Sequence, residues 1–174
     1  MIELVRPTVE LAEAWRASAG DFPAGAVLHG YGLPLDHDEF LSRTTDSEIV
    51  RYFTDAECGV GLPDGWVPCT TYWIVDDSAP DVVLGSLALR HHIETDFLRE
   101  FGGHIGYGVR PSARGTGVAS AALRAALLRA AALGIARVLL TCDEDNIASR
   151  RTIEGCGGVF ERMAGVRRRY WIAT

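Results

Sequence analysis

The residues VRPSARGTGVASAAL, at positions 109–123, place an arginine and two glycines immediately ahead of an alanine-rich helical pattern. The start of a helix leaves backbone N–H groups unpaired and carries about half a positive charge, so it attracts anions. Glycine lacks the Cβ that would keep a phosphate away from the backbone. We therefore expect a phosphate site here, with Arg114 adding a full positive charge. The amides expected to point at the phosphate are those of Gly115, Thr116, Gly117, Val118 and Ala119.

This turn matches neither of two common phosphate-binding motifs. It lacks the lysine of GxxxxGK[ST]. It also departs from the dinucleotide pattern GxGxxG, because Ser120 stands where the third glycine would be. Two interpretations remain: a phosphate site of another kind, or a glycine-rich turn that only reverses the chain.

The rest of the sequence predicts the elements that position this turn. Apolar runs bounded by turn residues predict strands at 2–6, 71–77, 82–91, 103–109 and 136–142 and a final hairpin at 159–173. Helical spacing predicts helices at 9–19, 37–53, 113–133 and 146–154, with 94–103 as a connection that can be helical. Asp36 and Glu39 have the spacing of a capping box at the start of the second helix. The order predicts an α/β (α+β) fold, a mixed, largely antiparallel sheet flanked by helices, in one domain over 1–174.

Composition narrows the class of protein. Hydrophobic residues make up 48% of the chain and the net charge is −6, which favours a folded domain over disorder and disfavours nucleic-acid binding. No apolar run is long enough to span a membrane and no signal peptide is visible, so we expect a cytoplasmic protein. The four cysteines form no CxxC pair, and we expect no metal site.

The motif Arg114-Gly-Thr-Gly117-Val-Ala119 resembles the signature [RQ]xxGx[GA] of the GNAT superfamily of acetyl-CoA-dependent N-acyltransferases. The strand GHIGYGV before it, the buried run ARVLLTC after it and the Asn-x-x-Ser spacing at 146–149 strengthen the resemblance. It is firm over about 82–174, the expected acetyl-CoA-binding core, and loose over 1–70, the expected acceptor side. The chain also looks like a bacterial branch known only as predicted acetyltransferases.

The resemblance implies a cofactor site, residue by residue. The amides of Arg114 to Ala119, together with Ser120, would bind the CoA pyrophosphate, and the backbone of Val109 would pair with the pantetheine arm. Asn146 and Ser149 would face the pantetheine from the other side, although a plain helix cap remains an alternative for Asn146. The family's usual tyrosine acid would stand at Ile153, which cannot donate a proton.

Acetyl transfer to an amine also needs a base, since the attacking amine must be neutral. The candidates are His104, favoured first, then His91, His92 and Glu94, with Tyr107 as an acid. Strict alternation places His104 and Tyr107 on opposite faces of their strand.

The acceptor side, at about 21–70, is rich in acidic residues. Eleven acids stand against four bases in residues 1–60, which suggests a cationic amine acceptor, either a small molecule or a peptide. The leading interpretation is an N-acetyltransferase acting in a ternary complex, without metal and as a monomer or homodimer. The alternatives are an inactive CoA-binding module with the same fold and a phosphate-binding protein that uses the turn alone.

Overall fold

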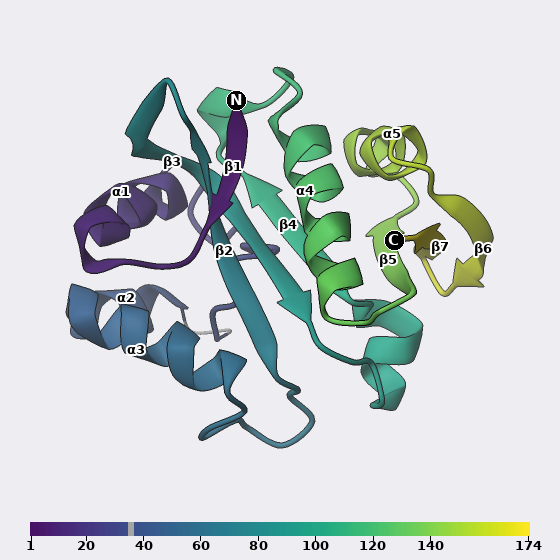
Figure 1. Ribbon diagram of the computed structural model, residues 1–174, viewed down its shortest axis with the longest axis horizontal. Coiled ribbons are helices and arrows are strands. Elements are labelled where there is room, and N and C mark those ends of the chain that lie inside the picture. The colour runs from purple at the N-terminus through teal and green to yellow at the C-terminus, as the bar shows by residue number, and fades with distance from the viewer. Residues whose placement is uncertain (35–36) are drawn as a thin grey trace.

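The computed structural model describes residues 1–34 and 37–174 as two antiparallel sheets with helices packed on them (Figure 1). The first sheet has the order β1-β2-β3-β4 and the second β5-β7-β6. The strands are β1 (Ile2–Val5), β2 (Cys69–Asp76), β3 (Ala79–Arg90), β4 (Ile105–Val109), β5 (Arg137–Asp143), β6 (Val159–Ala164) and β7 (Arg167–Ala173). The helices are α1 (Val9–Gly20), α2 (His37–Arg43), α3 (Asp46–Glu57), α4 (Val118–Ala132) and α5 (Ile147–Gly155), with a π-turn η1 (Leu98–Gly102) and a 3₁₀ turn η2 (Pro111–Ala113). The α/β prediction with a largely antiparallel sheet is confirmed, with the sheet divided in two.

The first sheet lies between two helical layers. Helices α1 and α3 pack on one face and α4 on the other, next to the second sheet (Figure 1). The alternation of side chains along a strand that is covered on both faces explains why the run TYWIV is buried throughout. Ile74 belongs to the hydrophobic cluster under α4, whereas Trp73 and Val75 belong to the cluster under α1. Trp15 of α1 stacks on Trp73 with ring centroids 5.4 Å apart.

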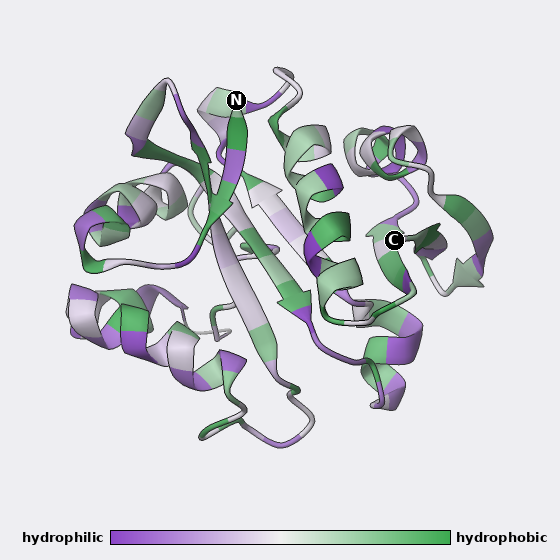
Figure 2. Cartoon of the chain, in the orientation of Figure 1, coloured by the Kyte–Doolittle hydropathy of each residue, from purple (hydrophilic) through white to green (hydrophobic). Residues whose placement is uncertain are grey.

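Helix α4 fills the space between the two sheets. It is hydrophobic over most of its length in Figure 2, and Arg124 and Arg129 are its charged residues. Val118, Ala122 and Ala126 follow one another at intervals of four, and all three are buried. Small side chains at this spacing let α4 lie close to both sheets, and they fix the position of its first turn.

The predicted helix at 37–53 is two helices in the structure. Helix α2 ends at Arg43, and α3 begins at Asp46 after a capping box made by Thr45 and Glu48. The Thr45 hydroxyl accepts from the Glu48 amide, and the Glu48 carboxylate accepts from the Thr45 amide. The capping box predicted at Asp36 lies outside the described residues.

The predicted helix at 113–133 begins later than expected, at Val118. Residues Pro111–Ala113 form the separate turn η2. Gly115 and Gly117 then adopt positive φ angles of 75° and 85°, which no helical residue adopts. The alanine-rich pattern continues across this boundary, so helical spacing alone did not reveal it.

Candidate active site

His104, immediately before β4, connects the start of β4 to β5 by two hydrogen bonds. The His104 amide donates to the Leu139 carbonyl at 2.7 Å, and the Leu139 amide donates to His104 Nδ1 at 2.9 Å. Beyond this bridge the two strands belong to different sheets. A wedge-shaped gap therefore opens toward Val109, at the end of β4.

The backbone of β4 faces this gap. The Arg110 amide donates to the Leu84 carbonyl of β3 at 2.9 Å. In an antiparallel ladder alternate residues point their amides toward the same neighbour, so the amides of Tyr107 and Val109 point away from β3. They can pair with an extended chain lying in the gap, as predicted for Val109.

A cleft of about 610 Å³ lies at the end of β4, between the first turn of α4, the start of α5 and the loop at 22–29. We call it the strand–helix cleft. Arg114 and Arg151 line it, and its described lining contains no aspartate or glutamate. The lining also includes the predicted cofactor residues Val109, Gly115, Gly117, Val118, Ala119, Ser120, Asn146 and Ser149. Two arginines and a helix start around a cleft of this size suit an elongated polyanion.

The first turn of α4 is open toward the cleft. Gly117 is the N-cap residue of the helix, and no side chain caps it. The Ala121 amide donates to the Gly117 carbonyl at 3.1 Å. The amides of Val118, Ala119 and Ser120 precede this bond and stay available to a ligand. A Cβ added at Gly115 or Gly117 would meet nothing within 4 Å, so the space beside the turn is open.

Arg114 and Thr116 differ from their expected roles in detail. The Arg114 amide donates to the Pro111 carbonyl at 3.3 Å, so it is not free for a phosphate. The Arg114 side chain instead crosses the cleft wall, where Nε donates to the Val109 carbonyl at 3.0 Å and the guanidinium lies over the Phe22 ring. The Thr116 hydroxyl donates to Ala113 and does not line the cleft.

Helix α5 supplies the opposite wall. Asn146 caps this helix, because its Oδ1 accepts from the Ser149 amide at 3.0 Å, and it also lines the cleft. Because Asn146 both caps the helix and lines the cleft, its role as a cap does not exclude the predicted contact with pantetheine. The Ser149 hydroxyl lies 3.0 Å from the Tyr107 hydroxyl. Burial raises the pKa of Tyr107 to about 12, so this phenol keeps its proton at neutral pH.

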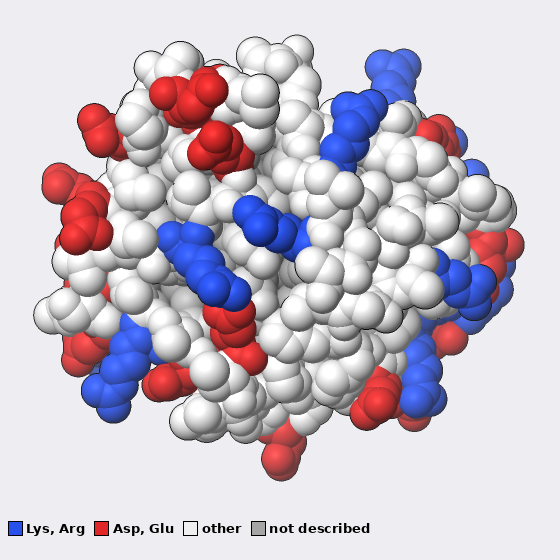
Figure 3. All heavy atoms as spheres, viewed as in Figure 1, with Lys and Arg blue, Asp and Glu red and all other residues white. Residues whose placement is uncertain are grey.

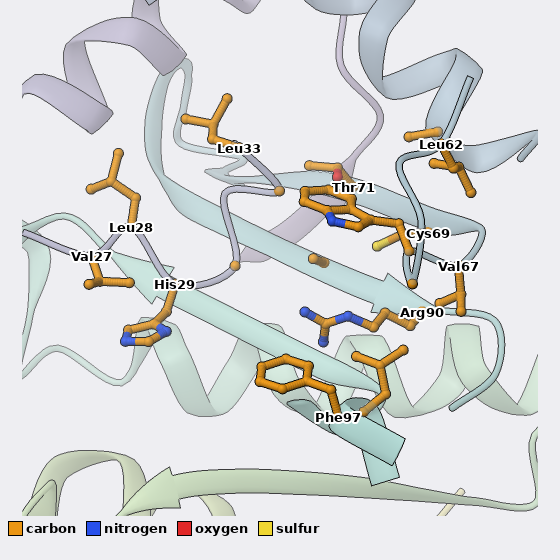
Figure 4. A pocket seen from close by; sticks show the side chains of 17 residues that line it. Val27, Leu28, His29, Leu33, Leu62, Val67, Cys69, Thr71, Arg90 and Phe97 are labelled. Carbon is orange, nitrogen blue, oxygen red and sulfur yellow. The ribbon is translucent and has the colours of Figure 1, made fainter. Parts of the chain in front are cut away.

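A second, smaller cavity of about 280 Å³ lies beside the cleft (Figure 4). We call it the apolar pocket. Its walls come from the loop before α2, the loop before β2, the β2–β3 surface and the segment at η1. Val27 and His29 line both cavities, so the two spaces meet at these residues. His29 can therefore contact a molecule bound in either cavity.

His29 was not among the residues singled out from the sequence. Its loop is anchored by Tyr31, which is fully buried and whose hydroxyl lies 3.0 Å from the Ser18 hydroxyl. Gly30 lets the loop lie directly on β4. His29 stays exposed to the cavities, yet the surrounding chain partly desolvates its ring and lowers its pKa below the usual 6.5, as does Arg167. His29 is therefore mostly neutral at pH 7 and able to accept a proton.

His104 has a structural role instead of the predicted catalytic one. It is buried, its Nδ1 accepts the Leu139 amide, and it lines neither cavity. Burial and the charge of Arg90 lower its pKa to about 4. These contacts speak against His104 as the general base and explain its position at the junction of the sheets.

Replacing His104 by asparagine tests this role. Asparagine Oδ1 keeps an acceptor for the Leu139 amide but does not titrate. Because the pKa of His104 falls on folding, the unfolded chain binds this proton more readily, and the wild type loses stability as pH falls from about 6.5 toward 4. We expect His104→Asn to weaken that acid loss of stability in pH-dependent denaturation and to keep kcat within about threefold. A loss of kcat of a hundredfold with unchanged stability would restore His104 as a base.

The other base candidates also lie outside both cavities. His91 Nε2 is 2.8 Å from the Thr70 hydroxyl, and His92 pairs with Glu94 at 3.6 Å. None of these side chains lines either cavity.

The expected acidic rim is not part of the cavities either. On the face in Figure 3, many acidic side chains lie on the half of the molecule that holds α1 and the β2–β3 turn. Two acids of the acceptor-side region form ion pairs elsewhere: Asp46 pairs with Arg16, and Glu57 with Arg6. Neither lines a cavity, so the acidic bias of this region does not mark a cationic subsite.

Comparison with known proteins decides the family. A family model described as an acetyltransferase (GNAT) domain matches residues 34–159. This chain belongs to the GNAT acetyltransferase family. It is therefore an acyltransferase, and the resemblance read from the Arg114 motif is confirmed. No curated protein matches the chain in a sequence search.

Solved structures share the fold. An acetyl transferase from Salmonella typhimurium that modifies the N-terminal serine of a ribosomal protein aligns with a TM-score of 0.63 at 17% identity, over 99% of this chain and 95% of that one. An N-acetyltransferase from Staphylococcus aureus aligns with a TM-score of 0.59 at 17% identity, over 99% and 97%. The self-immunity acetyltransferase MccE, solved with acetyl-CoA and AMP, aligns with a TM-score of 0.60 at 15% identity, over 99% and 92%.

Two searches for other kinds of site found nothing in the described residues. No group of three or more His, Cys, Asp or Glu side chains there is arranged to hold a metal ion. No helix in the described ranges is long and apolar enough to cross a membrane.

Proposed function

We propose that this GNAT enzyme transfers an acetyl group from acetyl-CoA to a primary amine by direct attack in a ternary complex. The observation that carries the proposal is the meeting of two cavities at His29, one suited to a polyanion and one mostly apolar. Holding both reactants at one junction replaces a bimolecular encounter by a reaction between bound groups. Residues 82–174 would hold acetyl-CoA, and residues 1–70 would supply much of the acceptor side, within one domain.

The strand–helix cleft fits acetyl-CoA, which supplies the acetyl thioester. The free amides of Val118, Ala119 and Ser120 would bind its pyrophosphate, with Arg114 and Arg151 adding positive charge. In the same cleft, the Val109 amide would bind the pantetheine arm as a neighbouring strand would, with Asn146 and Ser149 along the other side.

His29 would accept the proton that the amine must lose. An alkyl amine of pKa about 10.4 is charged at pH 7, and its deprotonation costs roughly 4–5 kcal/mol. A neutral imidazole at the junction takes this proton, directly or through water, as the amine attacks. The new C–N bond forms, the C–S bond breaks, and the electron pair leaves on sulfur.

Tyr107 would stabilise the departing sulfur in place of the family's usual tyrosine, whose position holds Ile153. The Tyr107 hydroxyl lies in the cleft beside Ser149 and carries its proton at neutral pH. With the pKa of Tyr107 at about 12, proton transfer to a thiolate of pKa about 8.5 would be uphill by roughly 5 kcal/mol. Tyr107 therefore acts as a hydrogen-bond donor to the thiolate, and solvent completes the protonation.

An inactive CoA-binding module is the second candidate, because Ile153 cannot serve as an acid. A module would bind acetyl-CoA without releasing thiol when amines are added, whereas an enzyme releases one thiol for each acetylated amine. We further expect a cytoplasmic protein without nucleic-acid or membrane partners, as a monomer or a homodimer.

Acetyl-CoA is expected to raise the melting temperature by about 5–10 °C when present at about 100 times its Kd. Such a ligand adds roughly 2.7 kcal/mol of stability, and for a chain of this length each kcal/mol corresponds to about 2–4 °C. The measurement is a thermal melt with acetyl-CoA, with ATP at the same concentration as control. A shift with acetyl-CoA alone supports the assignment of the cleft. No shift at millimolar acetyl-CoA would refute it.

A further inference from the structure

The apolar pocket contains one full positive charge. Most of its wall is hydrophobic, with Leu28, Leu33, Leu62, Trp66, Val67 and Phe97 among the lining residues. Arg90, at the end of β3, reaches into this space beside Phe97 in Figure 4. No aspartate or glutamate occurs among the described residues that line the pocket. The described pocket wall is therefore positively charged, whereas the acidic N-terminal region suggested a negatively charged site for a cationic amine.

The hydrogen bonds of Arg90 leave one edge of its guanidinium open. Within residues 1–34 and 37–174, Nη1 alone donates, to the carbonyls of Gly102 at 3.4 Å and Gly103 at 3.1 Å. These bonds hold the side chain against the η1 segment. The Nε and Nη2 atoms remain, and together they form an edge on which arginine binds a carboxylate with two parallel hydrogen bonds.

Several other partly buried arginines of this protein pair with a carboxylate. Arg16 pairs with Asp46 at 2.9 Å, and Arg169 pairs with Glu161 at 2.7 Å. A guanidinium among apolar walls is unfavourable unless an anion accompanies it. Within the described chain Arg90 forms no such pair, so the pocket presents a fixed donor to an anionic group brought by a ligand.

The size of the pocket limits what that ligand can be. Its volume of about 280 Å³ lies at the lower end of small-molecule sites, which span roughly 300–1,000 Å³. A compound of amino-acid size fits this volume, whereas an aminoglycoside exceeds it, and a peptide fits only by its first residue, which carries no carboxylate on its backbone for Arg90. The ligand must also place an amine at His29, where the pocket joins the cleft.

We propose that the acceptor is a small amino acid with an apolar side chain, whose carboxylate binds Arg90 and whose amine reaches His29. This inference rests on the proposed acetyl transfer and names its substrate class. The apolar side chain would lie against Leu33, Leu62 and Val67. Arg90 would repel polyamines and other compounds whose charges are all positive, since a like charge in such a pocket is unfavourable.

The test compares acceptors that differ only in the carboxylate. Leucine, leucinamide and 3-methylbutylamine are each offered with acetyl-CoA, alongside methionine, phenylalanine, spermidine and a short peptide, and thiol release is followed. We expect kcat/KM for leucine to exceed that for leucinamide and for the decarboxylated amine by at least tenfold. The comparison needs no variant, so it holds even where substitutions disturb folding.

A variant pair then assigns the effect to Arg90. Arg90→Gln is expected to lower kcat/KM for leucine by about 10–100-fold, mainly through KM, and to leave the value for 3-methylbutylamine within threefold. Arg16→Gln removes an arginine that pairs with Asp46 and lies away from both cavities, and it is expected to change neither kcat/KM value. Retention of the acetyl-CoA melting shift shows that each variant is folded.

The possible outcomes distinguish a failure of the amino-acid inference from a failure of the proposed acetyl transfer. Acetylation of leucinamide, spermidine or the peptide in preference to leucine overturns the inference and leaves acetyl transfer standing. Binding of acetyl-CoA with no acetylation of amino acids, and no further melting shift from them, also overturns it. Absence of any acetyl-CoA shift contradicts the proposed function itself.

Discussion

Replacing His29 by alanine is expected to lower kcat by about 10²–10⁴-fold, the contribution typical of a general base. The imidazole lies where the two cavities meet, and the chain around it favours its neutral form. Without it, the amine must lose its proton to bulk water before attack. The KM for acetyl-CoA should change little, because the amides and arginines proposed to bind its pyrophosphate are untouched. Initial rates with acetyl-CoA varied at a saturating amine concentration measure both quantities.

The pH profile identifies the titrating group. The pKa of His29 lies below 6.5. On the acid side of the pH profile, kcat should therefore rise as pH increases through that lowered pKa and then reach a plateau. His91→Gln is a matched control, because burial also lowers the pKa of His91, yet its ring contacts Thr70 and lines neither cavity. An acid limb that persists in His29→Ala and disappears in His91→Gln would exclude His29 as the base.

The proposed cofactor side of the site could be located from the sequence because its signal is local. A helix start bared by glycine depends on residues that follow one another, and Gly115 through Ser120 do so. The sequence did not reveal which backbone amides of this turn are already hydrogen-bonded or where α4 begins. The carbonyl of Pro111 takes the Arg114 amide, and helical spacing runs through the two glycines, so the helix was expected to begin five residues early.

The acceptor side was not predictable because it depends on contacts between distant segments. His29 meets the cleft only because its loop crosses β4, and nothing in the local pattern around residue 29 indicates that crossing. His104 was favoured as a base on the strand that runs into the Arg114 motif, yet its partner Leu139 stands 35 residues away. The acids of 1–70 suggested a cationic ligand, whereas Arg90, from β3, is the charge that reaches the pocket.

Gly30 is the residue on which this arrangement depends most. A Cβ at Gly30 would lie 2.3 Å from the Tyr107 Cα, and 2.7 Å from that residue's backbone carbonyl carbon and nitrogen. Backbone atoms of a strand held in a sheet cannot move aside as a flexible side chain does. Its φ of +79° is also unfavourable for any residue with a Cβ. The loop and β4 therefore fit together only with glycine at this position.

Gly30→Ala is expected to cost about 3–5 kcal/mol of stability, combining the unfavourable backbone angle with overpacking against β4. For this chain length that lowers the melting temperature by about 10–15 °C. Gly25→Ala, in the same loop, is the matched control. Gly25 has a φ of +75° but nothing within 4 Å of an added Cβ, so it should cost only about 1–2 kcal/mol.

The same pair separates stability from catalysis. Where Gly30→Ala remains folded at low temperature, its loop must move off β4 and carry His29 away from the junction of the cavities. We therefore expect kcat to fall toward that of His29→Ala, while the melting shift with acetyl-CoA persists because the α4 turn is unchanged. Gly25→Ala should keep wild-type kcat. Equal melting temperatures and equal kcat for the two variants would show that the loop does not rest on β4 in solution, and the placement of His29 would then be wrong.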